Sequence, residues 1–366
     1  MRILDRYILQ SVFTVFLTCL ISFLFLYVII DAVTFLTDIL KQKTSIFLLV
    51  QYYLSYLPII FVKVSPFSCL LATLYTFGKL NRNNEVIAMR AAGLSIMQIT
   101  KTVIIFGAVI SLVVFWVNDR FVPSSVSVTK KIKDQIEGGI KKPRAGEPET
   151  ITNLSMYGSR NRLFFVNKFL LSRSAMEGII IFEHDRNQDI TQKIVATSGL
   201  YKNGKWTFYQ TMTYDLDPNG QLKGEPRYAE EEVVDILETP RDFLNQRQSP
   251  DSMTIAQIND YIRKLSASGA ITAVRNLTVD LYQKFTTPLT ALVILILSIP
   301  FSLMMRKRAT GLSSLGLSIA VGFLYYVFNA LSITLGYAGV FSPLLAVSLS
   351  HTVVLLFSIY LINTLP

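Results

Sequence analysis

Three lysines stand where the headgroup of an anionic lipid could be bound: Lys41, Lys43 and Lys63. Lys41 and Lys43 follow one apolar run, and Lys63 lies inside the next. At about 1.5 Å of rise per helical residue, Lys63 is roughly 22 Å from the end of its run at Gly78. A lysine in the middle of a membrane span costs about 2.5 to 3.5 kcal/mol, so its position needs a physical reason.

Two interpretations of these lysines remain open. An ammonium group pairs with phosphate as a point charge, so all three could face a cavity and bind the phosphates of a lipid. Alternatively, Lys63 extends its side chain along the span until the ammonium reaches the membrane surface. Asp31 and Asp38 lie nearby in the sequence and would neutralise part of the positive field.

The other reactive residue types predict no catalytic or metal chemistry. His184 stands among acids at the end of a predicted strand, and His351 is alone in an apolar run, so no His/Cys cluster exists for a metal. The glycine–lysine pairs at 78–79 and 204–205 lack the flanking residues of a P-loop. We therefore expect no catalytic residue, no metal and no cofactor, and any ATP hydrolysis must come from a separate polypeptide.

The segment NRNNEVIAMRAAGLSIMQ, residues 81–98, predicts a short helix that is bounded on both sides. An asparagine at 83–84 can cap it, and Gly93 can end it. Ser95 and Gln98 then form a capping box for the next helix.

This short helix has two possible roles. It is either a connector at the membrane surface or a coupling helix that docks into a groove on a cytoplasmic motor. Under the second interpretation, Glu85 and Arg90 project into the cytoplasm. The residues expected to carry the coupling are Glu85, Met89, Arg90 and Gly93.

Six apolar runs are each long enough to cross a bilayer, which needs about 20 residues per helix. They cover residues 10–36, 54–78, 100–118, 286–305, 312–335 and 343–362. Three of them precede a long polar segment and three follow it. The predicted fold class is an α-helical integral membrane protein with six transmembrane helices and an all-β, jellyroll-like insert between the third and fourth.

The polar segment contains β-branched and aromatic runs separated by turn residues. Asn203-Gly204 between two of these runs is the preferred pair for a type I′ hairpin. Several short strands at such spacing favour a sandwich, a jellyroll or an open barrel. A short amphipathic helix should follow, beginning at the cap residue Thr254 and ending near Gly269.

These elements divide the chain into three parts. Residues 1–118 hold three spans, with the cytoplasmic helix over 81–94. Residues 119–253 form the β-rich insert, and residues 254–366 hold the connector helix and three further spans.

The net charge of +10 predicts orientation rather than nucleic-acid binding. In the short loops, nine basic residues lie on one side of the membrane and two, Lys41 and Lys43, on the other. Because positive residues concentrate in cytoplasmic loops, the nine mark the cytoplasmic side. The insert is then on the outer side, which is the periplasm in a two-membrane bacterium. The nine residues are Arg2, Arg6, Lys79, Arg82, Arg90, Lys101, Arg306, Lys307 and Arg308.

The order of spans and insert, together with three segments, resembles the LptF/LptG (YjgP/YjgQ) permease family. The segments are LDRYI at 4–8, EVIAMRAAG at 85–93 and YQKFTTPL at 282–289. The resemblance covers essentially the whole chain. LDRYI and the segment 252–269, SMTIAQINDYIRKLSASG, are more similar to the LptG branch.

The resemblance implies a permease subunit of an ABC transporter that extracts lipopolysaccharide from the inner membrane and passes it to a periplasmic bridge. The implied partners are lipopolysaccharide, a cytoplasmic ATPase dimer (LptB-like), a second six-span permease subunit (LptF-like), a single-span periplasmic partner (LptC-like) and the bridge itself (LptA-like). It also places lipopolysaccharide phosphates near basic residues just past the first span.

Two other classes of function compete with this one. A mechanotransmission or scaffold protein would couple a cytoplasmic ATPase to periplasmic events without moving lipid, but such proteins commonly carry their insert after the first span. A lipid-modifying enzyme would need paired carboxylates or a His/Asp set at the membrane surface. The apolar runs offer only Asp31, Asp280 and His351, far apart in sequence.

Overall fold

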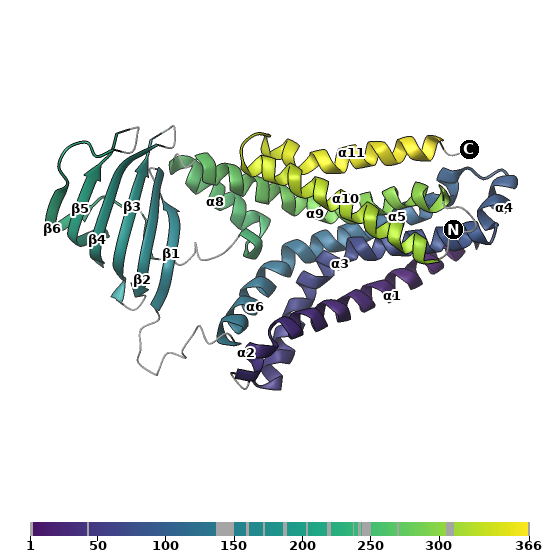
Figure 1. The fold of residues 1–366 in the computed structure, drawn as a ribbon, viewed down its shortest axis with the longest axis horizontal. Helices are drawn as coiled ribbons and strands as arrows, with labels where there is room; N and C mark the ends of the chain where they lie inside the picture. Colours follow the sequence, from purple (N-terminus) through teal and green to yellow (C-terminus); the bar gives the residue numbers. More distant parts are fainter. Residues whose placement is uncertain are drawn as a thin grey trace. The chain divides into compact units, whose positions relative to one another are not determined.

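The chain folds into two compact units, a helical unit and a β-rich unit. The helical unit is formed by Met1–Glu137 and Thr278–Pro366, and the β-rich unit lies within Gly138–Leu277. The structure is a computed structural model (Figure 1). It describes residues 3–41, 44–136, 150–158, 161–170, 173–185, 189–202, 204–217, 221–236, 238–240, 243, 250–268, 271–304 and 311–364.

Within the described residues, six helices are long and apolar enough to cross a membrane, which confirms the predicted six-span class. They are α1 (Ile3–Thr34), α3 (Ile46–Arg82), α5 (Ile96–Arg120), α9 (Ile271–Met304), α10 (Gly311–Tyr337) and α11 (Pro343–Thr364). In the described part of the helical unit, three shorter helices accompany them: α2 (Leu36–Lys41), α4 (Glu85–Ala91) and α6 (Val122–Ile136).

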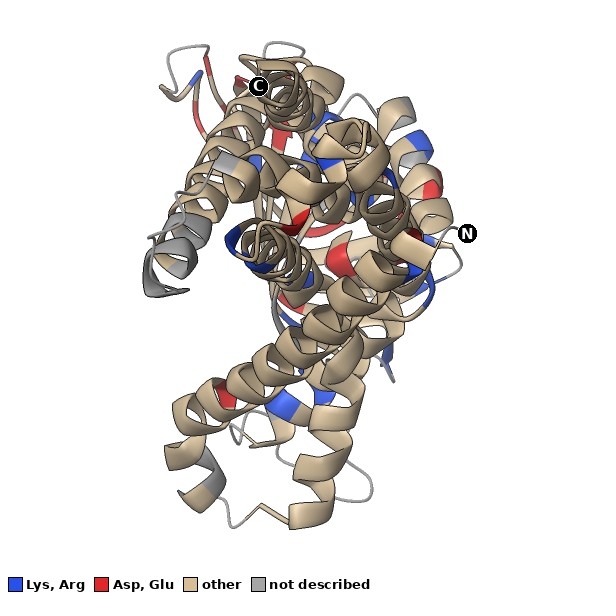
Figure 2. Cartoon of the chain, turned by 90° about the vertical axis from the view of Figure 1, so that its right-hand side faces the viewer, with Lys and Arg blue, Asp and Glu red and all other residues tan. Residues whose placement is uncertain are grey.

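The outer surface of the helical unit has the composition of a lipid-facing surface. In α1, Phe25, Ile29 and Val33 are all more than half exposed, and most of the length of the helices in Figure 2 carries no charge. A contiguous apolar surface of this kind is unusual on a soluble protein. Hydroxyl groups in α1 bond to their own helix, as Thr18 Oγ1 does to the carbonyl of Thr14 at 2.9 Å. Internal bonding of this kind is what a bilayer requires.

Helix α6 was not predicted from the sequence, which assigned residues 119–253 to the β-rich insert. It packs against α3 in the helical unit. Val122 lies beside Ile59 and Val62, and Ile132 and Ile136 lie beside Tyr52. Pro123 in its first turn is favourable for a helix start, because the backbone N–H missing from proline has no intrahelical partner there.

The β-rich unit contains a six-stranded antiparallel sheet whose strands pair in sequence order, β1 to β6. The strands are β1 (Thr150–Gly158), β2 (Arg162–Leu170), β3 (Ala175–His184), β4 (Ile190–Lys202), β5 (Lys205–Asp215) and β6 (Arg227–Val234). The all-β insert is thus confirmed. The described strands form a meander, and the crossover connections of a complete jellyroll are not among them.

One face of the sheet carries the core of this unit. Trp206 and Phe208 of β5 are fully buried with Phe243, and the Trp206 Nε1–H donates to the Glu238 carbonyl at 2.7 Å. The hairpin between β4 and β5 pairs Lys202 with Lys205, as its turn residues predicted. Gly204 has φ +82°, a value that glycine adopts readily; Asn203 lies outside the described residues.

Helix α8 (Ile255–Ser268) confirms the predicted amphipathic helix. Thr254 and Gln257 form a capping box at its start, with Thr254 N donating to Gln257 Oε1 at 2.8 Å and Gln257 N donating to Thr254 Oγ1 at 3.3 Å. The predicted stop at Gly269 lies outside the described residues.

Candidate functional site

Lys63 reaches toward α1 from the middle of α3. Its Nζ atom lies over the ring of Tyr27 at 5.9 Å from the centroid. The Tyr27 hydroxyl is 3.2 Å from that of Tyr56, which lies two turns before Lys63 on α3. The Lys63 side chain is exposed, so its ammonium remains accessible beside this aromatic pair.

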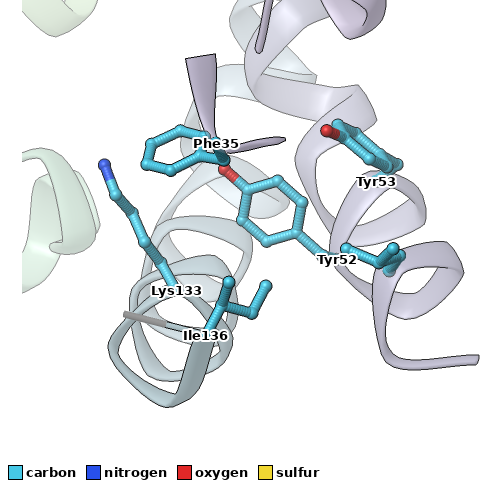
Figure 3. A pocket seen from close by; sticks show the side chains of 6 residues that line it. Phe35, Tyr52, Tyr53, Lys133 and Ile136 are labelled. Carbon is cyan, nitrogen blue, oxygen red and sulfur yellow. The ribbon is translucent and has the colours of Figure 1, made fainter. Parts of the chain in front are cut away.

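A second lysine, Lys133, reaches from α6 to the residue that follows α1. Its Nζ atom lies over the ring of Phe35, 4.3 Å from the centroid. Figure 3 shows Lys133 and Phe35 beside a small pocket. Its lining residues are Phe35, Leu49, Tyr52, Tyr53, Lys133 and Ile136.

Asp31 lies between these two lysine contacts. Tyr27 and Asp31 are four residues apart on one face of α1, and Phe35, four residues further, follows the end of the helix, where its N–H donates to the Asp31 carbonyl at 3.1 Å. Tyr52 and Tyr53 act on the Asp31 carboxylate through their hydroxyl groups, and Lys63 and Lys133 act on it through their charge. We call Tyr27, Asp31, Lys63 and Lys133 the basic cluster.

The other two sequence-predicted lysines are only partly located. Lys41 is the last residue of α2, and its side chain is not among those described. Lys43 lies outside the described residues. The structure therefore places Lys63 near the same carboxylate, Asp31, as Lys133, a residue that the sequence analysis did not select.

Two ammonium groups beside half-buried aromatic rings can bind phosphate while apolar chains pack nearby. They offer no nucleophile and no general base. Among the described residues no group of three His, Cys, Asp or Glu side chains could hold a metal.

His351 in α11 is part of a buried polar network between three helices. Its Nε2 atom lies 3.2 Å from Thr290 Oγ1 of α9 and 3.1 Å from the Tyr325 hydroxyl of α10. Its Nδ1 atom lies 3.1 Å from the Val347 carbonyl. This is the interhelical bonding of a structural histidine. His184 is half-buried at the end of β3, with Nδ1 3.3 Å from the Asn161 carbonyl.

The predicted short helix is present as α4, and its predicted end is confirmed. The predicted asparagine cap at its start is wrong, because Asn84 has φ +62° and its side chain makes no capping hydrogen bond. Gly93 follows the helix at φ +86°, and Leu94 N donates to the Met89 carbonyl at 3.2 Å, as in a Schellman motif. Ser95 and Gln98 then form the predicted capping box at the start of α5.

Helix α4 is attached to the ends of its neighbours by an apolar face. Val86 and Met89 are buried in the same core as Ile8 of α1 and Ile99 of α5. Met89 is only 8% exposed, so it holds α4 in place within the chain. The Tyr7 hydroxyl of α1 donates to Glu85 Oε2 at 3.1 Å (α4 and the N-terminus lie at the same end in Figure 1).

The exposed face of α4 differs from the one predicted. Glu85 is half-buried and also accepts from Asn83 Nδ2 at 3.0 Å, so it ties α4 to α1 and to the preceding turn. Arg90 and Gly93 are exposed, and Ile87 exposes 49% of its surface. An exposed isoleucine beside an arginine gives this helix an outward face that is suited to docking.

The model of the family "Lipopolysaccharide export system permease LptF/LptG" matches residues 6–364. The chain belongs to the LptF/LptG family. It is 21% identical over 330 residues to the lipopolysaccharide export system permease protein LptG of Escherichia coli strain K12, covering 89% of this chain and 88% of that protein. LptG of Escherichia coli O6:H1 strain CFT073 matches to the same extent.

Membership in the LptF/LptG family confirms the resemblance seen in the sequence and gives the broad function, a permease for lipopolysaccharide export. Members are transporter subunits rather than hydrolases. Six apolar helices and the permease family fit a multi-pass inner-membrane protein.

Proposed function

We propose that this chain is a transmembrane subunit of an ABC exporter that takes lipopolysaccharide from the inner membrane and passes it to a periplasmic bridge. The observation that carries the proposal is the family match over residues 6–364, which includes all six spans and the insert. A spanning permease without ATPase motifs needs a separate motor, and α4 provides a docking surface at one end of its helical unit.

The substrate site in this proposal is the basic cluster together with Lys41 and Lys43. Lipopolysaccharide carries phosphate groups beside acyl chains, so it requires cations next to apolar surface. Lys63 and Lys133 meet that need because each ammonium lies over an aromatic ring. Each desolvated charge-assisted contact contributes about 1.5 to 3 kcal/mol, so two of them make a sizeable difference in affinity.

The proposed coupling route to the motor runs through α4. Ile87 and Arg90 face outward for docking, whereas Val86, Met89 and Glu85 join α4 to the rest of the chain. Gly93 permits the sharp exit to α5. The proposed partners are an LptB-like ATPase dimer, an LptF-like second permease, an LptC-like single-span protein and an LptA-like bridge.

Purification in mild detergent from native membranes tests the function as a whole. We expect a soluble ATPase and a second six-span protein to accompany the chain with bound lipopolysaccharide, and ATP to drive release of that lipid. Recovery of the ATPase without bound lipopolysaccharide would indicate the mechanotransmission role instead. Recovery of neither would contradict the proposal.

The proposed orientation, with the insert in the periplasm, is tested by thiol labelling. In a background with Cys19 and Cys69 replaced by serine, we expect Lys223→Cys in the insert to react with an impermeant maleimide from the periplasm. Arg82→Cys at the end of α3 should react only after the inner membrane is permeabilised. Both side chains are exposed, so accessibility within the protein is matched. The reverse pattern would contradict the orientation.

The predicted orientation depends on the excess of basic residues in the short loops on one side of the membrane, and the structure describes only some of these residues. Four of the nine basic residues on the predicted cytoplasmic side lie outside the described residues: Arg2, Arg306, Lys307 and Arg308.

A further inference from the structure

Asp31 is the unexpected member of the basic cluster, because a carboxylate opposes the binding of an anion. It is half-buried, and its Oδ2 atom is buried without a hydrogen-bond partner in the described part of the chain. A buried acceptor of this kind costs free energy unless a charge nearby compensates it. Part of the compensation comes from the hydroxyl groups of Tyr52 and Tyr53, and the positive charges of Lys133 and Lys63 add to it.

Asp31 lies along the chain between the two rings that the lysines contact. It is one turn from Tyr27, over which Lys63 lies, and one turn from Phe35, over which Lys133 lies. Lys63 comes from α3 and Lys133 from α6, so three helices contribute to one charge cluster. With Asp31 ionised, these three residues carry a net charge of about +1, whereas the two lysines alone would carry about +2.

We propose that Asp31 is the resident counter-ion of the basic cluster: it neutralises Lys63 and Lys133 when no lipid is bound and weakens the hold on a bound lipid phosphate. This inference rests on the proposed substrate site and adds a residue that sets how readily lipid leaves it. A phosphate that enters must share the two ammonium groups with the carboxylate and is repelled by it. When the phosphate leaves, the carboxylate is already in place, so the two lysines are never left uncompensated.

The test measures lipid occupancy of the full-length chain, purified with any subunits that accompany it. Nanodiscs of phosphatidylethanolamine would contain a rising mole fraction of bis-phosphorylated lipid A, with occupancy read by native mass spectrometry. We expect Asp31→Asn to raise the affinity for lipid A on the order of tenfold, because one repelling charge is removed at short range. The gain should be smaller for phosphatidylglycerol, whose phosphate carries a single negative charge.

Three controls make the result specific. Asp31→Glu keeps the charge and should behave as the wild type, and Glu230→Gln in β6 removes one negative charge far along the chain and should change nothing. In a background with both Lys63 and Lys133 replaced by glutamine, Asp31→Asn should give no gain. Asp31→Ser serves as a second neutral variant if Asp31→Asn does not accumulate.

The outcomes separate this inference from the proposed function. If the lysine variants lower lipid A occupancy and neither neutral variant at Asp31 raises it, the counter-ion role is overturned and the substrate site stands. If the lysine variants leave occupancy unchanged, the substrate site is overturned and the counter-ion role falls with it. A gain at Asp31 that persists without the lysines also overturns the inference.

Discussion

Purified with Lys63 and Lys133 both replaced by glutamine, the protein should carry at least about tenfold less lipopolysaccharide than the wild type. Glutamine keeps the polarity of each side chain and removes its charge. Loss of two desolvated charge-assisted contacts, each about 1.5 to 3 kcal/mol, is large enough for this decrease even if part of it is compensated. The measurement is lipopolysaccharide per protein at equal expression.

The matched control replaces Lys79 and Lys101 by glutamine, which removes the same charge from two exposed lysines on the predicted cytoplasmic side. This variant should retain its lipid. If Lys63 only extends to the membrane surface, both double variants will bind lipopolysaccharide equally, and the substrate contacts must then lie on the apolar faces of the spans.

Placing negative charge on the exposed face of α4 should abolish attachment of the ATPase. In an Ile87→Asp, Arg90→Glu double variant, an apolar contact and a positive charge are both replaced by negative charge at a surface that the chain itself does not bury. We expect at least about tenfold less ATPase in the purified complex, because a central apolar anchor and an arginine each commonly contribute 2 kcal/mol or more to an interface.

Two control substitutions in α4, one conservative and one at a buried position, distinguish a loss of ATPase docking from a loss of folding. Ile87→Leu should retain the ATPase. Met89→Ala should lower the thermal stability of the helical unit, since Met89 is buried in the core that holds α4, and should impair docking only as far as α4 loosens. Full ATPase recovery with the Ile87→Asp, Arg90→Glu double variant would leave α4 as a connector.

Features with local signals were predictable from the sequence. Helix α4 was located because Gly93 and the pair of Ser95 and Gln98 determine its end and the next start within a few residues. The β4–β5 hairpin followed from its turn residues in the same way. The depth of Lys63 in the membrane could be estimated by counting residues along a single apolar run.

Features that depend on packing between distant segments were not predictable. In α6, the buried positions include Ser125 and Thr129 between Val122 and Ile132, so no apolar stripe is visible in the sequence. Lys133 was missed for that reason, although the buried positions 122, 125, 129, 132 and 136 are spaced three and four residues apart, which is typical of a helix.

The inward direction of Met89 was missed for a related reason. The periodicity of α4 groups Val86 with Met89, but it does not say whether that group faces the chain or a partner. In the structure, α4 packs on α1 and α5, so this group faces the chain itself.

The length of α3 has a mechanical consequence. This helix carries Lys63 near its middle and ends at Arg82, immediately before α4. Beyond Pro66 it contains no proline, so this part acts as a stiff lever arm. The distance from Pro66 to Arg82 is roughly 24 Å at about 1.5 Å per residue, so a tilt of about 5° at the α4 end would displace the turn that carries Lys63 by roughly 2 Å. A stroke of that size is enough to break a contact between an ammonium group and a phosphate.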